Sequence, residues 1–436
     1  MGLSAAISAS LAREFLAVSP ERGDDLDPRM AVVTGLGTIN PLGGDVASTW
    51  SALHDSRCAV RSLDASWMQG IEMPVTIAAP LAVDPAQRLT PKESRRLDRA
   101  SQCALLAARE AWTQAGTPEV ADERLAVSVS PGMGPVLSVM DAWDALRERG
   151  PRRVAPTAIP ALMPNAPAAA VGIELGAHGG IHAPVSACAS GAEAIAYGAD
   201  LIALGRADVV VAGGTDAALH PMTVAAFGAM RALSTRNADP QTASRPFAPD
   251  RDGFVLGEGA GILVLERAAH ALARGARVLA VLAGTGVTAD AYDVARPEPS
   301  GTEQERALRM ALGRADLDAG AVGHVNAHAT STPAGDVVEA GVLARTVPNA
   351  AVSATKSATG HLLGGAGGLE AVLTVMALQE RWAPPTLLPA GVDPELARLG
   401  LDVVGPQGRD LPNLTAAAST SFGFGGHNVA LVFARQ

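Results

Sequence analysis

Short apolar runs rich in β-branched residues alternate along this chain with Ala-rich stretches of helical spacing. Within the runs, apolar residues follow one another with little polar alternation, which is typical of strands buried on both faces. The runs lie at residues 30–40, 124–130, 207–214, 260–266, 277–284, 323–329, 350–357 and 428–434. This order predicts an α/β protein whose parallel sheets are covered by helices on both sides.

Reactive side chains follow the apolar runs in both halves of the chain. Cys188 stands in a short polar loop of the first half, and His328 and His361 stand in such loops of the second. A duplicated fold would produce this arrangement. We therefore expect three segments: an N-terminal leader at 1–29, a first half at 30–275 and a second half at 276–436.

The composition limits the classes of protein to consider. With 436 residues, 48% of them hydrophobic, the chain can bury a large core and is not of the disordered class. Its net charge of −10 argues against a nucleic-acid-binding protein, because phosphate binding relies on an excess of Lys and Arg. No run is long and apolar enough to span a bilayer, and Arg13 and Glu14 interrupt the N-terminal stretch, so we expect neither a membrane span nor a signal peptide.

Cys188 has the setting expected of a nucleophile. The apolar segment 180–187 leads to it, and residues 189–205 have helical spacing, so Cys188 falls where a strand turns into a helix. Free N–H groups at a helix start favour a thiolate, and small neighbours leave room for a substrate carbonyl. Cys58 and Cys103 lack this setting and are interpreted as structural thiols. Three dispersed cysteines give no disulfide framework, which predicts a cytoplasmic protein.

His328 and His361 occur among small residues just after apolar runs, where the active sites of α/β proteins gather. Lys356 stands five residues before the second of them. A single histidine in such a place is more often structural, but two of them with a lysine indicate proton handling and polarisation of a carbonyl. A metal site is disfavoured, because no acidic or thiol ligand stands at a fixed short spacing from either histidine.

Two glycine-rich segments have different interpretations. STSFGFGGHN, residues 419–428, predicts a loop whose backbone N–H groups face a developing oxyanion. GTGVTAD, residues 284–290, lacks the strand and helix context of a dinucleotide site. We therefore assign no cofactor to it.

Together these motifs resemble those of the β-ketoacyl-[acyl carrier protein] synthases, of the elongating type II kind. The resemblance runs from about residue 30 to the C-terminus and rests on SACASG, NAHATSTPAGD, TKSATGH, SRPFAPDRDGFVLGEGAG and SFGFGGHN. It implies a thiolase-like fold with duplicated halves in a layered αβαβα arrangement. A thiolase would carry a second catalytic cysteine near its C-terminus, and the initiating synthases pair Cys with His and Asn. This chain shows neither pattern.

The resemblance implies a decarboxylative Claisen condensation that lengthens an acyl chain by two carbons. Cys188 would take the acyl group from a carrier thioester, and the backbone N–H groups of Cys188 and Phe424 would form the oxyanion hole. Phe424 would also act as a gate between the acyl pocket and the malonyl site. His328 and His361 would stabilise the enolate that decarboxylation of malonyl-carrier leaves. No metal or organic cofactor is required.

Other matching positions are implied to support these groups or to line the pocket. Lys356 would hold the catalytic arrangement, with Asp336 and Glu370 as polar supports. The implied substrate-binding residues are Met133, Phe227, Ala295, Thr330 and Thr332.

The chain departs from the family pattern at several of these positions. Ala329 stands where relatives have Gly, and its methyl group crowds the backbone without removing a reacting group. Pro131 stiffens the loop that carries Met133, the residue expected to limit the acyl pocket. Where relatives have a His followed shortly by Thr-Ser, AYDVARP, residues 291–297, places Asp293, Ala295 and Arg296 near the pantetheine side.

An acidic carrier protein is the implied partner, and a chain of net charge −10 must offer it a local basic surface. Three separate segments match carrier-docking positions of relatives, although most charge runs are only solvated helix faces. Their cations are Lys92, Arg95, Arg96, Arg152, Arg153 and Arg231. The resemblance also implies a homodimer.

Two rival functions remain at this stage. The first is a non-catalytic partner similar to the chain-length factors, which replace the nucleophile; the presence of Cys188 and both histidines disfavours it. The second is a spare synthase for specialised metabolism or inhibitor tolerance, suggested by the departures at 130–135 and 291–297. The acyl length, its branching and the pathway do not follow from the sequence.

Overall fold

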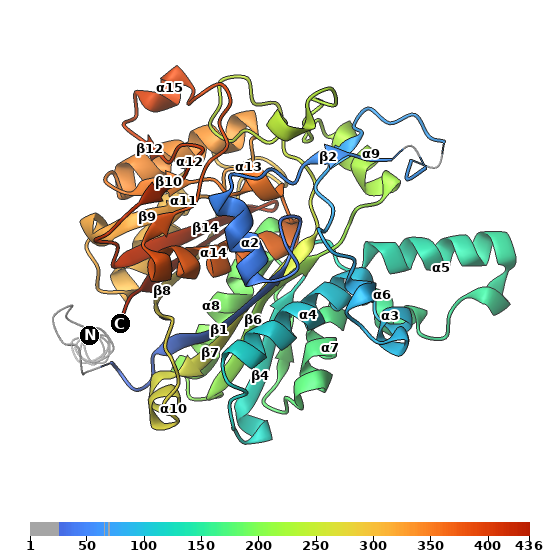
Figure 1. Ribbon diagram of the computed structural model, residues 1–436, viewed down its shortest axis with the longest axis horizontal. Helices are drawn as coiled ribbons and strands as arrows, with labels where there is room; N and C mark the ends of the chain where they lie inside the picture. Colours follow the sequence, from blue (N-terminus) through green and yellow to red (C-terminus); the bar gives the residue numbers. More distant parts are fainter. Residues whose placement is uncertain (1–25, 65, 69) are drawn as a thin grey trace, which may run out of the picture.

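The computed structural model describes residues 26–64, 66–68 and 70–436, which fold into stacked layers of sheet and helix (Figure 1). Eleven strands of the described residues form one sheet, in the order β12-β10-β9-β14-β15-β8-β1-β7-β6-β4-β5. They are β1 (Ala31–Ile39), β4 (Leu125–Ser130), β5 (Ile181–His182), β6 (Val209–Asp216), β7 (Gly259–Arg267), β8 (Ala280–Ala289), β9 (Val322–Asn326), β10 (Ala351–Ser353), β12 (Asp402–Val403), β14 (Ala416–Gly423) and β15 (His427–Ala434).

The sheet has two halves with the same pairing pattern. In the first half, β1 pairs antiparallel with β7, β7 pairs antiparallel with β6, and β4 pairs parallel with both β6 and β5. In the second half, β8, β15, β14, β9 and β10 repeat this pattern in the same order. The halves join where β1 and β8 pair, Val32 with Val281 and Val33 with Ala280. The predicted duplication of the fold is confirmed.

Helices lie in the middle of the molecule and on both outer sides, which confirms the layered αβαβα arrangement. Apolar clusters pack α4 and α7 on one half-sheet, α11 and α12 on the other, and the α8 and α14 pair between them. These helices are α4 (Arg99–Gln114), α7 (Ala166–Leu175), α8 (Ser190–Ala203), α11 (Thr302–Arg314), α12 (Pro333–Thr346) and α14 (Ala366–Glu380). The middle helices direct their N-terminal ends, and the loops before them, toward the junction of the halves.

Glycines let the central strands approach the outer helices closely. A Cβ at Gly35 on β1 would meet the carbonyl oxygen of Ala111 on α4, and a Cβ at Gly284 on β8 would meet that of Ala311 on α11. The two contacts occupy equivalent places in the duplicated halves. The glycines of GTGVTAD therefore have a packing role.

The prediction of parallel sheets is wrong for part of the structure. The pairs β1 with β7, β6 with β7, β8 with β15 and β14 with β15 are antiparallel. Apolar runs report burial on both faces but not strand direction. The sequence analysis also missed β14 and assigned part of it to a loop, because its small and polar residues, AAASTSFG, become a strand only between β9 and β15.

The remaining elements lie mostly around the sheet. Figure 1 shows α5 (Val136–Arg149) and α6 (Ala158–Leu162) extending away from it. The others are α2 (Val46–His54), α3 (Pro91–Arg96), α9 (Pro221–Ala229), α10 (Ala268–Ala273), α13 (Lys356–Thr359), α15 (Pro394–Ala397) and the paired short strands β2 (Arg61–Ser62) with β3 (Ile77–Ala78) and β11 (Trp382–Ala383) with β13 (Arg409–Asp410). Across the described ranges, no helix is both long enough and apolar enough to cross a membrane.

The predicted boundary between residues 275 and 276 falls in the segment that links α10 to β8. We propose it as the boundary between the two halves, because the repeated strand pattern restarts at β8. Most of the predicted leader, residues 1–29, lies outside the described residues.

Candidate active site

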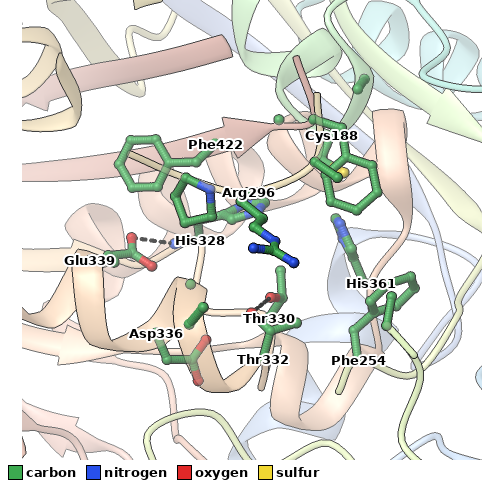
Figure 2. Close-up of a pocket in the computed structure, with 18 of the residues that line it drawn as sticks. Cys188, Phe254, Arg296, His328, Thr330, Thr332, Asp336, Glu339, His361 and Phe422 are labelled. Atoms are coloured by element: carbon green, nitrogen blue, oxygen red, sulfur yellow. Dashed lines mark hydrogen bonds between the residues drawn. The ribbon is translucent and has the colours of Figure 1, made fainter. Parts of the chain in front are cut away.

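A cavity of about 440 Å³ opens at the junction of the two halves, and loops from both halves line it (Figure 2). Eleven residues proposed from the sequence are among those that line it: Met133, Cys188, Phe227, Arg231, Ala295, His328, Thr330, Thr332, Asp336, His361 and Phe424. Lys356 and Glu370 lie buried behind this lining. The structure thus brings the predicted nucleophile and both histidines into one cavity.

Cys188 lies in a short 3-10 helix, Ala187–Ala189, that leads directly into α8. Ala187 has a φ of 52°, a conformation that non-glycine residues rarely adopt, so the turn before the nucleophile is strained. Gly423 packs against this turn, and a Cβ there would meet the carbonyl oxygen of Ser186. This close packing brings the hairpin turn that carries Phe424 beside the cysteine. The predicted strand before Cys188 is short, since only Ile181 and His182 pair with β4.

The Cys188 thiol is protonated in this cavity at neutral pH. Burial raises its pKa to about 12, against the opposing effects of the Lys356 charge and of the backbone N–H groups of Phe424 and Cys188. The predicted stabilisation of a resting thiolate by the helix start is therefore wrong, because burial outweighs it. The two opposing N–H groups are those predicted to form the oxyanion hole, and both act on the sulfur.

His328 and His361 face each other across the cavity. Their ring centroids lie 5.4 Å apart with an angle of 85° between the planes. Phe254 lies edge-on to His361 at 5.3 Å, and Phe422 lies edge-on to His328 at 5.9 Å. The sequence analysis assigned no role to these two phenylalanines, although both stand in segments that carried the family resemblance. They make the surroundings of the imidazoles apolar.

Both imidazoles are neutral at physiological pH. Burial, followed by the Lys356 charge, lowers the pKa of each well below the usual 6.5. The Lys356 ammonium, 3.4 Å from Nδ1 of His328, donates a hydrogen bond there, so Nδ1 is the acceptor and Nε2 carries the proton. His328 can therefore donate a hydrogen bond into the cavity. Nδ1 of His361 is buried without a hydrogen-bond partner among the described residues.

Lys356 and Glu370 form a fully buried ion pair. Lys356 stands at the start of α13, and Glu370 lies on the first turns of α14, so the pair ties the loop before His361 to the central helix layer. The carboxyl group of Glu370 holds the ammonium beside His328. This position is consistent with the supporting roles expected for Lys356 and Glu370.

Two carboxylates hold the segment that carries His328. Glu339 accepts hydrogen bonds from the backbone N–H groups of His328, at 2.8 Å, and of Ala329, at 2.6 Å (Figure 2). Asp336 accepts from the N–H groups of Phe247 and Ser331 and is fully buried. The sequence analysis missed Glu339, although its position three residues after Asp336 places both acids on one face of α12.

Asp216, at the end of β6, was also missed. It is fully buried and accepts hydrogen bonds from the N–H groups of Gly132, Met133 and Gly364, at 2.9, 3.2 and 2.8 Å. It thereby joins the loop that carries Met133 to the turn that follows His361. Burial raises its pKa to about 7, against the effect of these N–H donors.

The proposed substrate-binding residues lie on several sides of the cavity. Met133 is 41% exposed, and Phe227 packs edge-on against Phe254 at 5.2 Å. Thr330 and Thr332 are hydrogen-bonded to each other through their hydroxyl groups, at 3.1 Å. Ala329 is buried and its methyl group fits the apolar cluster around α12, so this departure from the family pattern is accommodated.

The six proposed docking cations are exposed and form two groups. Arg95 and Arg96 on α3 and Arg153 beside it line a second hollow of about 380 Å³, where Arg149 of α5 joins them. Arg149 was not proposed from the sequence. Lys92 and Arg152 adjoin these residues in the chain, whereas Arg231 lines the main cavity.

The other two cysteines lie away from the cavity lining. Cys103 is fully buried in α4, where burial raises its pKa well above the usual value. Cys58 is partly buried and its thiol lies 3.6 Å from the carbonyl oxygen of Ser357. Their surroundings are those of structural thiols.

Comparisons with known proteins agree with this geometry. Family models described as "Beta-ketoacyl synthase, N-terminal domain" and "Beta-ketoacyl synthase, C-terminal domain" match residues 29–271 and 279–388. A protein named 3-oxoacyl-[acyl-carrier-protein] synthase 2 from Mycobacterium tuberculosis is 42% identical over 93% of this chain and 97% of its own length. The protein of that name from Staphylococcus aureus is 40% identical over 93% and 98%.

Solved structures give the same result. A β-ketoacyl synthase from Burkholderia phymatum superposes with a TM-score of 0.85 and 36% identity, over 93% of this chain and 99% of that one. A type II polyketide ketosynthase, solved in complex with its acyl carrier protein, superposes with a TM-score of 0.86 and 27% identity, over 94% and 100%. The chain therefore belongs to the β-ketoacyl synthase family.

Proposed function

We propose that this protein is an elongating β-ketoacyl-acyl carrier protein synthase. The observation that carries the proposal is the presence, in one cavity, of a cysteine thiol with two backbone N–H donors and a pair of neutral imidazoles. The relatives named 3-oxoacyl-[acyl-carrier-protein] synthase 2 support the same activity. The reaction needs a nucleophile, an oxyanion hole and donors for an enolate, and these groups supply all three.

In the first half-reaction, the sulfur of Cys188 attacks the carbonyl carbon of an acyl-carrier thioester. The bond to the carrier sulfur breaks, and the proton of the Cys188 thiol passes to the released carrier thiol. The N–H groups of Cys188 and Phe424 stabilise the oxyanion that forms in between. Because the Cys188 thiol is protonated before substrate binds, it must lose its proton as its sulfur attacks the bound thioester.

In the second half-reaction, malonyl-carrier loses CO₂, and the electron pair of the broken C–C bond passes to the thioester as an enolate. His328 and His361 donate hydrogen bonds to the enolate oxygen, and their neutrality suits this role since each keeps its own proton. The enolate carbon attacks the acyl group on Cys188. The product is a β-ketoacyl-carrier lengthened by two carbons, and the Cys188 thiolate regains a proton from water.

An acidic acyl carrier protein is the proposed partner for both steps. The hollow lined by Arg95, Arg96 and Arg153 and the cavity entrance at Arg231 are the proposed docking places. The ketosynthase solved with its acyl carrier protein supports a docked complex of this kind.

We also propose a cytoplasmic homodimer. The strand β5 lies at an open edge of the sheet, and Ile181 and Val185 expose apolar surface there, as does Ile173 of the neighbouring α7. A second copy would cover this edge. The three unpaired cysteines support a reducing compartment.

Mass spectrometry after incubation with a panel of acyl-carriers tests the activity. We expect an acyl adduct on Cys188 and, after addition of malonyl-carrier, a β-ketoacyl-carrier longer by two carbons. Cys188→Ala should abolish the adduct, whereas Cys58→Ala should retain it. An adduct on Cys58 or Cys103, or loading without any elongated product, would contradict the proposal.

A further inference from the structure

Arg296 places a cation at the main cavity. It lies in the loop between β8 and α11 and lines the cavity from the second half of the chain. Figure 2 shows its guanidinium extending into the cavity between the Thr330 and Thr332 pair and the two histidines. Its backbone N–H donates to Asp293, but in the described part of the chain its guanidinium has no hydrogen bond or ion pair.

The nearby carboxylates are held by other donors. Asp293 accepts from the N–H groups of Ala295, at 2.8 Å, and Arg296, at 2.9 Å, through the same oxygen. Asp290 accepts from the amide of Asn428, at 2.6 Å, and from the N–H of Glu298, at 3.0 Å. Asp336 and Glu339 likewise accept hydrogen bonds from backbone N–H groups. The charge of Arg296 contributes to lowering the pKa of Asp293, after the backbone N–H groups of Ala295 and Arg296, but in the described part of the chain the guanidinium forms no ion pair with a carboxylate.

The other basic groups at the catalytic centre are not available to an anion. Lys356 is buried in its pair with Glu370, and both histidines are neutral. Arg231 lines the cavity from the opposite half of the chain, where the carrier is proposed to dock. Arg296 is therefore the charge best placed to meet a negative group that arrives in front of the histidines.

The two thioester substrates of the proposed function differ in whether they carry a negatively charged group near the thioester. The acyl chain of the first thioester is neutral, whereas the malonyl group of the second carries a carboxylate that must lie close to the histidines before CO₂ leaves. A planar guanidinium matches a carboxylate with two parallel hydrogen bonds. We propose that Arg296 binds the carboxylate of the incoming malonyl thioester and selects it over neutral thioesters. This inference rests on the proposed function.

The proposal has a particular kinetic signature. A cation on the carboxylate stabilises the substrate before CO₂ loss, but the negative charge then moves to the thioester oxygen and leaves the guanidinium. The interaction is thus stronger in the bound substrate than in the transition state. Removing it should raise KM for the malonyl substrate while kcat stays the same or rises, a pattern that general damage to the fold does not produce.

The test compares Arg296→Gln and Arg296→Lys with the unchanged protein and with Arg306→Gln. Arg306 is an exposed residue of α11, paired with Glu303, and controls for the loss of one positive charge. Three assays are needed: acyl loading from acyl-carrier, condensation with malonyl-carrier, and condensation with malonyl-pantetheine, which has the carboxylate but no phosphate.

We expect Arg296→Gln to raise KM about 10- to 100-fold with both malonyl substrates and to leave acyl loading unchanged. Arg296→Lys should recover part of the affinity, and Arg306→Gln should match the unchanged protein. If KM rose for both acyl-carrier and malonyl-carrier, which have the phosphate, but not for malonyl-pantetheine, Arg296 would bind the pantetheine phosphate. That result would overturn the proposal. An unchanged KM, or a fall in kcat alone, would also overturn it. Failure of the unchanged protein to condense would instead refute the proposed function.

Discussion

The ammonium group of Lys356 lies 3.4 Å from Nδ1 of His328. Lys356 is held there by the carboxylate of Glu370, so a buried chain of three groups runs from α14 to the cavity. Burial and then the lysine charge lower the pKa of His328, and the lysine fixes which ring nitrogen carries the proton. A buried residue behind the cavity lining thus determines which nitrogen of a lining residue carries the proton.

Lys356→Met should reduce condensation roughly 10- to 100-fold, the loss typical of a positioning residue, and reduce acyl loading less. Without the neighbouring charge, the pKa of His328 should rise, although burial, the larger cause, still holds it below the usual 6.5, so that on acidification condensation should fall at a higher pH in the variant than in the unchanged protein. Rate measurements at a series of pH values provide the check. A variant with an unaltered pH profile would leave Lys356 with a structural role only.

The same variant also leaves Glu370 buried without a partner, which should lower the free energy of unfolding by about 3–5 kcal/mol. The double variant Lys356→Met, Glu370→Leu serves as its control. It should regain much of the stability in urea unfolding without regaining condensation, which separates folding from positioning.

His328→Ala and His361→Ala should each slow condensation roughly 100-fold or more, because each removes a donor to the enolate, and should affect loading much less. Since both pKa values lie well below 6.5, neither histidine of the unchanged protein should gain a proton between pH 8 and 6. On further acidification, the unfolded chain binds protons that the buried imidazoles resist, so stability should fall as the pH drops below about 6.5. Variants that load poorly but decarboxylate malonyl-carrier normally would reverse the assigned roles.

The high pKa of Cys188 predicts slow alkylation by iodoacetamide at neutral pH. In a Cys58→Ser, Cys103→Ala background, the rate should rise about tenfold for each pH unit from 7 to 10, because only the thiolate reacts and its fraction keeps increasing. The folded pKa exceeds the ordinary value of 9.0, so this group's contribution to stability is lost as the pH rises above about 9. A plateau in the alkylation rate below pH 8 would favour the helix-stabilised thiolate expected from the sequence.

Met133→Phe should shorten the range of acyl chains that Cys188 accepts. Met is flexible and can move aside for medium and long chains, whereas Phe blocks the space, and each methylene left unburied forfeits about 0.8 kcal/mol. Loading rates measured against chain length should fall for long chains and stay constant for short ones. Met163→Phe, a partly exposed methionine that does not line the cavity, is the matched control. If loading rate depended on acyl chain length in the same way for both variants, Met133 would not line the acyl pocket.

Sedimentation should report about twice the monomer mass of 44.2 kDa. Ile181→Lys places a charge on the open edge strand β5 and should shift the protein toward monomer. Leu399→Lys, an exposed apolar position in the second half of the chain, should not. A monomeric, fully active protein would contradict the dimer.

The strands and the chemical groups could be predicted from sequence because both leave local signals. The β-branched runs at 207–214 and 260–266 became β6 and β7, and the small-residue turns marked Cys188 and the histidines, which line one cavity. Strand direction has no local signal, which is why the antiparallel pairing of β6 with β7 was missed.

Long-range electrostatics could not be predicted for the same reason. The pKa of Cys188 depends on burial by segments far apart in the chain, and the local helix start indicated the opposite direction. Asp216 and Glu339 act on backbone N–H groups, which no sequence motif identifies. Glu339 had a partial signal in its spacing from Asp336, whereas Asp216 had none.

The repeated strand pattern places the reactive loops in corresponding positions. Cys188 lies between β5 and α8, and His361 lies between their counterparts β10 and α14; the Met133 loop follows β4, and the His328 segment follows its counterpart β9. The molecule thus has an internal pseudo-twofold arrangement, in which, under the proposed function, one half holds the electrophile and the other half generates the carbon nucleophile. Neither half contains a complete site, so substitutions in one half can retune its own part of the chemistry while the other half keeps its geometry.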